Sequence, residues 1–121
     1  MADRIMIVED EPHIVESLTF LLMREGYEVE AITDGESALA ALAGALPRVL
    51  VLDAMLPGID GFAILRRLRG EPRSAKLPIL VLTAKGQRRD REVAETLGAD
   101  RFLAKPFSNA ELIETIRELA R

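Results

Sequence analysis

Five short apolar runs, each followed by a longer segment of helical periodicity, limit what this chain can fold into more than any other feature. The runs at 49–52 and 79–82 are continuously apolar, as strands covered on both faces are. The other runs are 5–8, 29–32 and 101–104. A strand–helix order that repeats in this way predicts parallel strands joined by right-handed crossovers, with helices on both faces of one sheet.

Helix boundary signals separate the apolar runs from the helical patterns. Pro12 stands at the start of the first pattern and Gly26 just past its end, which are the places these residues favour. Asp60 is a predicted N-cap of the third helix, and Ser108 with Glu111 has capping-box spacing before the fifth. These signals divide the chain into strand–helix units, with no internal repeat or interdomain linker.

Length and composition fit one globular domain over residues 1–121. The chain has 121 residues, of which 49% are hydrophobic and 30% charged, so we expect a single core. Its net charge of −4 and its lack of a long basic run argue against direct nucleic-acid binding. The absence of cysteine excludes disulfides and thiolate metal sites. The first apolar run is too short for a signal peptide or a membrane span, so we expect a cytoplasmic protein without a membrane partner.

Polar side chains stand immediately after the predicted strands. Glu9 and Asp10 follow the first strand, Asp53 the third, Thr83 the fourth and Lys105 the fifth. In open parallel sheets, ligands bind at the carboxyl ends of the strands, near the point where the strand order reverses. We therefore expect these side chains to share one edge of the sheet and to form the functional site.

An acidic cluster of this kind favours a hard divalent cation. Two carboxylates about 4 Å apart repel each other by about 4 kcal/mol at an effective dielectric constant of about 20. Mg²⁺ relieves that repulsion, because it takes oxygen ligands and keeps waters and phosphate oxygens in its shell. With the Lys105 ammonium and the Thr83 hydroxyl beside the Asp53 carboxylate, the cluster fits a phosphoryl-transfer site with a carboxylate nucleophile.

Four segments carry a resemblance to a known family. They are V-E-D-E-P, V-L-D-A-M-L-P-G-I-D-G, L-T-A and G-A-D-R-F-L-A-K-P-F, in this order. Each is weak alone, but all four on these strand ends make a highly specific match. The chain resembles the CheY-like receiver domains of two-component response regulators over its whole length. The resemblance implies an α/β fold, a doubly wound five-stranded parallel sheet of flavodoxin-like (βα)5 type with strand order 2-1-3-4-5.

The resemblance implies a role for each acidic residue. Asp53 would accept a phosphoryl group from the phosphohistidine of a sensor histidine kinase or a phosphotransfer protein. Asp10, Asp53 and the backbone carbonyl of Met55 would bind Mg²⁺ directly, with Mn²⁺ as a substitute, and Glu9 would act through water. Glu9 stands where Asp is commoner, so its longer side chain is expected to alter the water shell.

The remaining site residues are implied in the same way. Thr83 and Lys105 would hold the phosphoryl oxygens, and the small Ala84 would leave room for them. Phe102 would be the switching aromatic; it stands where Tyr is frequent and has no phenolic hydroxyl. The Lys105–Pro106 peptide is expected to be cis, which X–Pro bonds readily permit.

The implied function is a phosphorylation-activated signalling switch and not a turnover enzyme. Phosphorylation would change the surface of the fourth helix, fifth strand and fifth helix to control an output partner or a fused output domain. DNA-binding members of the family form dimers through charge pairs on that surface. Here Arg91 and Glu111 supply one such pair, whereas Arg101 and Thr115 replace the usual second pair. These residues therefore supply only one of the two charge pairs that would support a phosphorylation-dependent homodimer.

Two alternatives share the predicted architecture. An aspartate-nucleophile phosphatase has a second Asp two residues after the nucleophile as general acid, and here that position is Met55. A flavodoxin-like cofactor binder has a Ser/Thr/Gly-rich phosphate loop after the first strand, and here that loop begins with Glu9 and Asp10. The residues therefore favour the phosphorylated switch over both.

Overall fold

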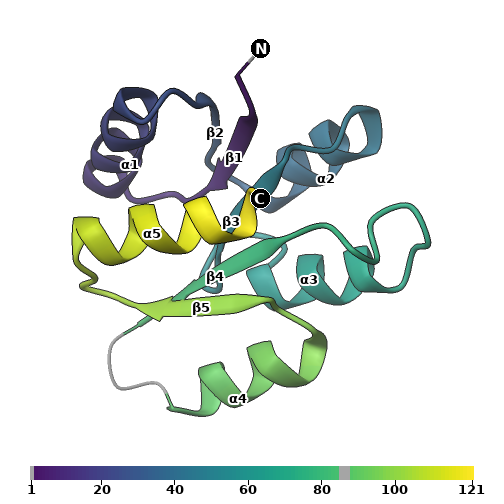
Figure 1. The fold of residues 1–121 in the computed structure, drawn as a ribbon. Coiled ribbons are helices and arrows are strands. Elements are labelled where there is room, and N and C mark those ends of the chain that lie inside the picture. Colours follow the sequence, from purple (N-terminus) through teal and green to yellow (C-terminus); the bar gives the residue numbers. More distant parts are fainter. Residues whose placement is uncertain (1, 85–87) are drawn as a thin grey trace.

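The five predicted strands form one parallel sheet in the order β2-β1-β3-β4-β5, which confirms the predicted fold class and strand order. A computed structural model describes residues 2–84 and 88–121. Strands and helices alternate along the chain (Figure 1). In order they are β1 Arg4–Val8, α1 Pro12–Arg24, β2 Glu28–Ile32, α2 Gly35–Gly44, β3 Val49–Asp53, α3 Gly61–Arg69, β4 Ile79–Thr83, α4 Arg88–Leu97, β5 Arg101–Ala104 and α5 Asn109–Leu119. None of the helices in these described parts is both long and apolar enough to cross a membrane.

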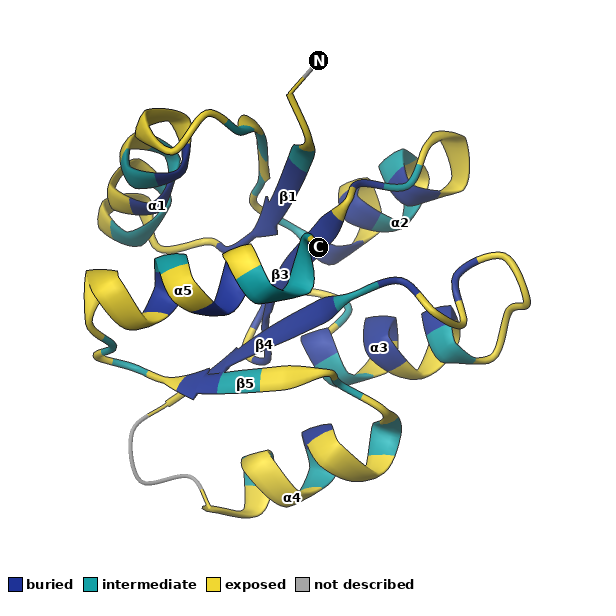
Figure 2. Ribbon diagram, in the orientation of Figure 1, coloured by how far each residue is buried: buried dark blue, intermediate teal, exposed yellow. Residues whose placement is uncertain are grey.

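Apolar side chains of the central strands alternate between two cores, one on each face of the sheet. Leu50 and Ile79 are register partners and pack with α2, α3 and α4. The next partners along the strands, Val51 and Leu80, face the opposite way and pack with α1 and α5. Every residue of β3 and β4 is buried, whereas the edge strands β2 and β5 are partly exposed (Figure 2). Burial on both faces explains why the runs that form β3 and β4 are continuously apolar.

Side-chain caps begin the helices at the predicted places. The Asp60 carboxylate accepts a hydrogen bond from the Ala63 N–H at 2.8 Å at the start of α3. The Ser108 hydroxyl oxygen accepts one from the Glu111 N–H at 3.0 Å at the start of α5. Gly26 ends α1 with a φ of 92°, a left-handed conformation that glycine adopts without strain. The caps of α3 and α5 fix where two loops at the carboxyl edge of the sheet end.

A charged contact links the end of α3 to the turn before β5. Arg69 Nη2 lies 2.9 Å from Asp100 Oδ2, and the same oxygen accepts a hydrogen bond from the Ile79 N–H at 2.8 Å. Arg69 also donates to the carbonyls of Gly98, at 2.9 Å, and Ser74, at 3.1 Å. The Arg69 side chain is 16% exposed and that of Asp100 is 43% exposed, so solvent screens the ion pair from the Asp100 side only. The contact ties α3, β4 and β5 together at the amino edge of the sheet.

We expect Asp100→Ala to lower the free energy of unfolding by about 2 kcal/mol, because it removes two hydrogen bonds to a charged group. Urea denaturation followed by circular dichroism measures this change. Glu92→Ala is the matched control, since Glu92 faces Arg88 across one exposed helix turn at 3.7 Å. That variant should lose less than about 0.5 kcal/mol. Equal losses in the two variants would contradict a structural role for Asp100.

Candidate functional site

The sheet brings the predicted carboxylates together where the strand order reverses. β1 lies between β2 and β3, so the chain leaves β1 toward one edge of the sheet and later returns to its other side. Glu9 and Asp10 follow β1, and Asp53 is the last residue of β3. One carboxylate oxygen from each of these residues lies within 4.8 Å of those of the other two. Three acidic groups therefore share one small volume at the carboxyl edge of the sheet.

Among the described residues, Lys105 supplies the cation of this cluster and contacts two of its members. Its Nζ lies 2.8 Å from Glu9 Oε1 and 3.2 Å from Asp53 Oδ2. Burial alone would lower the pKa of Lys105, but the contacts with Glu9 and Asp53 raise it above its ordinary value. The ammonium therefore stays charged and partly neutralises both carboxylates. The backbone N–H of Lys105 donates a hydrogen bond to the Thr83 carbonyl at 2.8 Å, which holds the start of the loop that follows β5 beside the end of β4.

Glu9 is completely buried, and its surroundings disfavour its charge. Burial, together with the neighbouring Asp53, raises the pKa of Glu9 to about 7, although Lys105 and the Glu11 N–H act in the opposite direction. Oε2 accepts a hydrogen bond from the Glu11 N–H at 3.1 Å. Among the described residues, Oε1 has the Lys105 ion pair but no contact with hydrogen-bond geometry. This buried oxygen can therefore accept a further hydrogen bond in the acidic cluster.

Asp53 is buried and held from two sides. Its Oδ1 accepts a hydrogen bond from the Met55 N–H at 3.0 Å, and its Oδ2 faces Lys105. Met55 is 66% exposed, and its backbone N–H faces the site. Gly61 packs against the backbone of Asp53, where a Cβ would lie only 2.1 Å from the Asp53 carbonyl oxygen. Sequence reasoning did not identify this role of Gly61, although the glycine lies inside the segment that carried the family resemblance.

Thr83 and Asp10 complete the group from opposite sides. Thr83 is the last residue of β4 and is buried, while Asp10 is exposed at the rim. Ala84 follows Thr83 and is exposed. The Lys105–Pro106 peptide is cis, as expected from the resemblance. The structure thus gathers the predicted strand-end residues at one edge of the sheet.

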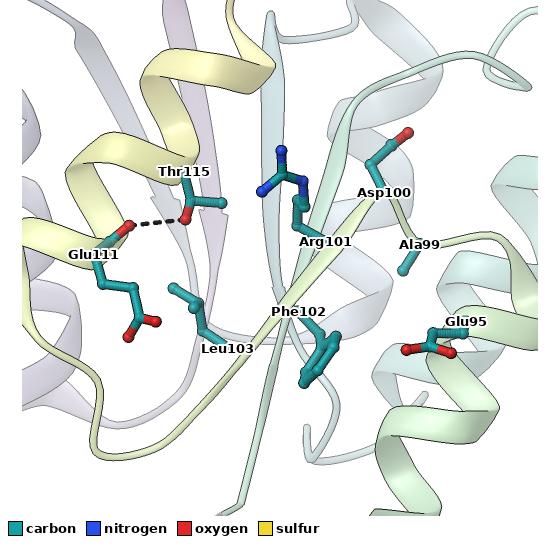
Figure 3. A pocket seen from close by; sticks show the side chains of 8 residues that line it. All are labelled: Glu95, Ala99, Asp100, Arg101, Phe102, Leu103, Glu111 and Thr115. Carbon is teal, nitrogen blue, oxygen red and sulfur yellow. Dashed lines mark hydrogen bonds between the residues drawn. The ribbon is translucent and has the colours of Figure 1, made fainter.

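Phe102 lies apart from the carboxylates, on β5. Its side chain is half-buried and lines a surface pocket of about 400 Å³ between α4, β5 and α5 (Figure 3). The guanidinium carbon of Arg91 lies 4.3 Å from the centroid of the Phe102 ring. Arg91 Nε also lies 3.2 Å from Glu95 Oε1, one turn along α4. The sequence does not reveal this contact, because nothing in the pattern shows which residue of α4 faces β5.

The other residues considered for a dimer make contacts within the chain. Arg101 Nη2 lies 2.6 Å from Glu118 Oε2. The Thr115 hydroxyl donates to the Glu111 carbonyl at 2.7 Å, one turn back along α5 (Figure 3). The Glu111 side chain lines the same pocket as Phe102.

Comparisons with known proteins agree with the fold of this chain. The family described as response regulator receiver domain matches residues 5–117. The phosphate regulon transcriptional regulatory protein PhoB of Rhizobium meliloti is 40% identical over 121 residues, which are 100% of this chain and 53% of that protein. The chain spans about half the length of the curated relatives it matches.

Solved structures agree as well. The crystal structure of a protein assigned as a response regulator from Chloroflexus aurantiacus is 38% identical, with a TM-score of 0.95 and coverage of 100% of both chains. The receiver domain of the sensor histidine kinase PA1611 from Pseudomonas aeruginosa is 30% identical, with a TM-score of 0.90, and the match covers 99% of this chain and 98% of that one. That structure has a magnesium ion coordinated in its active site cleft.

Proposed function

Because this chain belongs to the family of response regulator receiver domains, we propose that it is a phosphorylation-activated switch in which Asp53 accepts the phosphoryl group. One observation carries the assignment. Lys105 lies within 3.2 Å of the Asp53 carboxylate, and oxygens of Glu9 and Asp10 lie within 4.8 Å of it. A carboxylate beside an ammonium, with further acidic groups that would hold a divalent cation, is suited to attack phosphorus, because the ammonium and the cation would neutralise the charge that arrives.

The chain's own residues position and neutralise the transferred group. An oxygen of Asp53 bonds to phosphorus, and the bond from phosphorus to the donor histidine nitrogen breaks as that nitrogen takes up a proton. The Met55 N–H keeps the other Asp53 oxygen in place through its 3.0 Å hydrogen bond. Lys105 turns from the carboxylates to the phosphoryl oxygens, and the Thr83 hydroxyl donates to one of them.

The residues fit a bound Mg²⁺. The ligand set consists of oxygens, and the buried Glu9 Oε1 retains acceptor capacity toward it. We propose Asp10, Asp53 and the Met55 carbonyl as direct ligands and Glu9 as a ligand through water, with Mn²⁺ as a substitute for Mg²⁺. When bound, the cation supplies charge neutralisation at the phosphoryl oxygens.

Thr83 and Phe102 link the phosphate to the surface. Val81 and Phe102 are register partners, and Thr83 is two residues further along β4, so both of these β4 side chains point to the same face of the sheet. Movement of the Thr83 hydroxyl toward the phosphoryl group opens space on the face that Phe102 occupies. Phe102 then moves inward and changes the surface formed by α4, β5 and α5, where Arg91 and Glu111 lie.

The partners follow from this chemistry. The phosphodonor is a sensor histidine kinase or a phosphotransfer protein, and the surface controls an output partner or an output domain of a longer protein. One relative, RpaA of Synechocystis, is named a DNA-binding transcriptional regulator. We assign residues 1–121 to one receiver domain that acts in the cytoplasm without binding nucleic acid itself. A phosphorylation-dependent homodimer through Arg91 and Glu111 is part of the proposal.

The alternatives are less well supported. A phosphatase of the aspartate-nucleophile class needs a general acid where this chain has Met55, whose side chain points to solvent. A flavodoxin-like cofactor binder needs phosphate-binding donors where this chain has the acidic Glu9 and Asp10. The chain therefore acts as a phosphoacceptor signalling domain and not as a turnover enzyme.

Treatment with acetyl phosphate and Mg²⁺ tests the proposal directly. Intact mass spectrometry should detect one added phosphoryl group per chain, and hydroxylamine should remove it, as it removes acyl phosphates. A phosphoryl group that resists hydroxylamine, or rapid release of phosphate without any phosphorylated chain, would count against the switch. The second result would favour the phosphatase.

Mg²⁺ affinity should separate the two neighbouring acidic residues. Asp10→Asn should weaken binding more than Glu9→Gln, because Asp10 is the proposed direct ligand and Glu9 acts through water. An NMR titration with MgCl₂ measures both dissociation constants. Asp60→Asn is the control, since Asp60 caps α3 and either side chain can serve as a cap. A larger loss for Glu9→Gln would reverse the proposed ligand order.

A further inference from the structure

Arg91 of α4 makes a cation–π contact with the Phe102 ring of β5. Its guanidinium carbon is 4.3 Å from the Phe102 ring centroid, well inside the range of a cation–π interaction. The other such contact in the described residues, Arg24 with Phe20 at 5.7 Å, joins two residues of the same helix. The contact of Arg91 instead joins α4 to the edge strand β5. It therefore acts between two elements of the proposed output surface.

Because α4 is weakly anchored, this contact contributes more to the position of the helix than the same contact would on a well-buried helix. Ala94 is the one fully buried residue of α4, whereas α3 buries four residues, Gly61, Ile64, Leu65 and Leu68. Few apolar contacts therefore hold α4 against the sheet, and elements with few such contacts move at low free-energy cost. A single interaction between Arg91 and Phe102 can then contribute a large share of what fixes the α4–β5 arrangement.

Phe102 sits between two environments. On one side it packs against the core cluster that contains Val81, and on the other it lines the surface pocket (Figure 3). Arg91 is exposed and also pairs with Glu95, so its guanidinium is held at the surface. A guanidinium cannot follow the ring into the core, because burying an unpaired charge is strongly unfavourable. Inward movement of Phe102 therefore requires the ring to leave Arg91.

We propose that Arg91 is a positioning residue of the switch, whose guanidinium holds the Phe102 ring at the pocket and so favours the unphosphorylated arrangement. The proposal rests on the proposed function, since it needs Asp53 to be the phosphorylation site. It also couples the switch to the surface, because the ring's departure exposes one face of the Arg91 guanidinium while its pairing with Glu95 remains. A residue that resists activation in this way sets how much of the protein is active before phosphorylation.

The test compares Arg91→Met with Arg88→Met. Arg88 lies on the same helix and also faces a glutamate one turn along, Glu92 at 3.7 Å, so its variant loses the same charge without affecting a ring. Binding of beryllofluoride in the presence of Mg²⁺ to the whole chain, at a protein concentration where it stays monomeric, is followed by NMR of the Phe102 ring and nearby methyl groups. Arg91→Met should reach half-saturation at about a two- to five-fold lower beryllofluoride concentration, the factor that an exposed cation–π contact is worth. Arg91→Lys, which keeps a weaker cation, should lie between Arg91→Met and the wild type.

Two features separate this effect from others. Loss of a positive charge alone would weaken the binding of an anionic ligand, so a general electrostatic effect would have the opposite sign and would also occur in Arg88→Met. In a Phe102→Leu background, Arg91→Met should cause no further change, because the ring is gone. Equal affinities for Arg91→Met, Arg88→Met and the wild type would overturn the proposal, as would an effect of Arg91→Met that persists without the ring.

Comparison of the wild type with Asp53→Asn distinguishes failure of this inference from failure of the proposed function. If the wild type binds beryllofluoride and Asp53→Asn does not, Asp53 is the site, and the Arg91 variants judge this inference alone. If the wild type and Asp53→Asn behave alike, the switch itself is wrong, and the inference falls with it.

Discussion

Asp53→Asn should abolish phosphorylation by acetyl phosphate while the protein keeps its fold. An amide cannot act as the nucleophile, because its nitrogen and oxygen are far weaker nucleophiles toward phosphorus than a carboxylate. The side-chain oxygen can still accept the Met55 N–H hydrogen bond, which is 3.0 Å long with Asp53. Lys105 retains Glu9 at 2.8 Å as its partner. Intact mass spectrometry after treatment should show no added phosphoryl group.

The loss of charge at position 53 should also leave stability unchanged or slightly higher. Asp53 contributes to the raised pKa of Glu9, so removing its charge relieves repulsion in the acidic cluster. Asp60→Asn serves as the control, because Asp60 lies in the following loop and caps α3. That variant should be phosphorylated like the wild type. A phosphorylated Asp53→Asn chain would show that another residue accepts the group.

Among the glycines that the structure describes, Gly61 is the one whose change to alanine should cause the largest loss of stability. The new Cβ would lie 2.1 Å from the Asp53 carbonyl oxygen, 2.8 Å from Ala54 Cα and 2.9 Å from the Asp53 carbonyl carbon. All three atoms belong to the backbone, so no flexible side chain can move aside. The start of α3 would have to move away from the end of β3. We expect the free energy of unfolding to fall by about 3 kcal/mol or more, measured by urea denaturation.

Gly44→Ala is the matched control for this variant. A Cβ at Gly44 meets no atom within 4 Å, and the residue lies at the end of α2. Alanine there should leave stability unchanged or raise it by about 0.4–1 kcal/mol, because the unfolded chain loses freedom. Where enough Gly61→Ala remains folded to measure, its Mg²⁺ affinity should also fall, since Asp53 shifts. A Gly61→Ala chain as stable as Gly44→Ala would mean that α3 does not press on β3 at this point.

Much of the fold could be predicted because it depends on local patterns. The runs at 49–52 and 79–82 became β3 and β4, each one residue longer, and the helix caps at Asp60 and Ser108 lie where their residue types predicted them. The strand-end positions followed from the parallel topology. These features need only the order of apolar and polar residues along the chain.

Contacts between distant side chains could not be predicted in the same way. Arg69 and Asp100 are 31 residues apart, and each reads as an ordinary surface charge in the sequence. The approach of Lys105 to the buried Glu9 depends on how two loops fold over the edge of the sheet, not on either motif. The contact of Arg91 with Phe102 depends on the rotation of α4, and the exposed Arg91 gives no sign of it.

The sheet also divides the chain's apolar side chains into two layers that can vary separately. Phe102 packs in the layer of α2, α3 and α4, whereas Leu18 and Leu22 pack in the layer of α1 and α5. Leu18 and Leu22 share no core cluster with Phe102, and substitutions at sites that share no packing partners act additively on stability. Natural or engineered substitutions at Leu18 and Leu22 beneath α1 can therefore adjust how firmly the protein holds together while leaving the packing of Phe102 unchanged. The two properties can be selected independently.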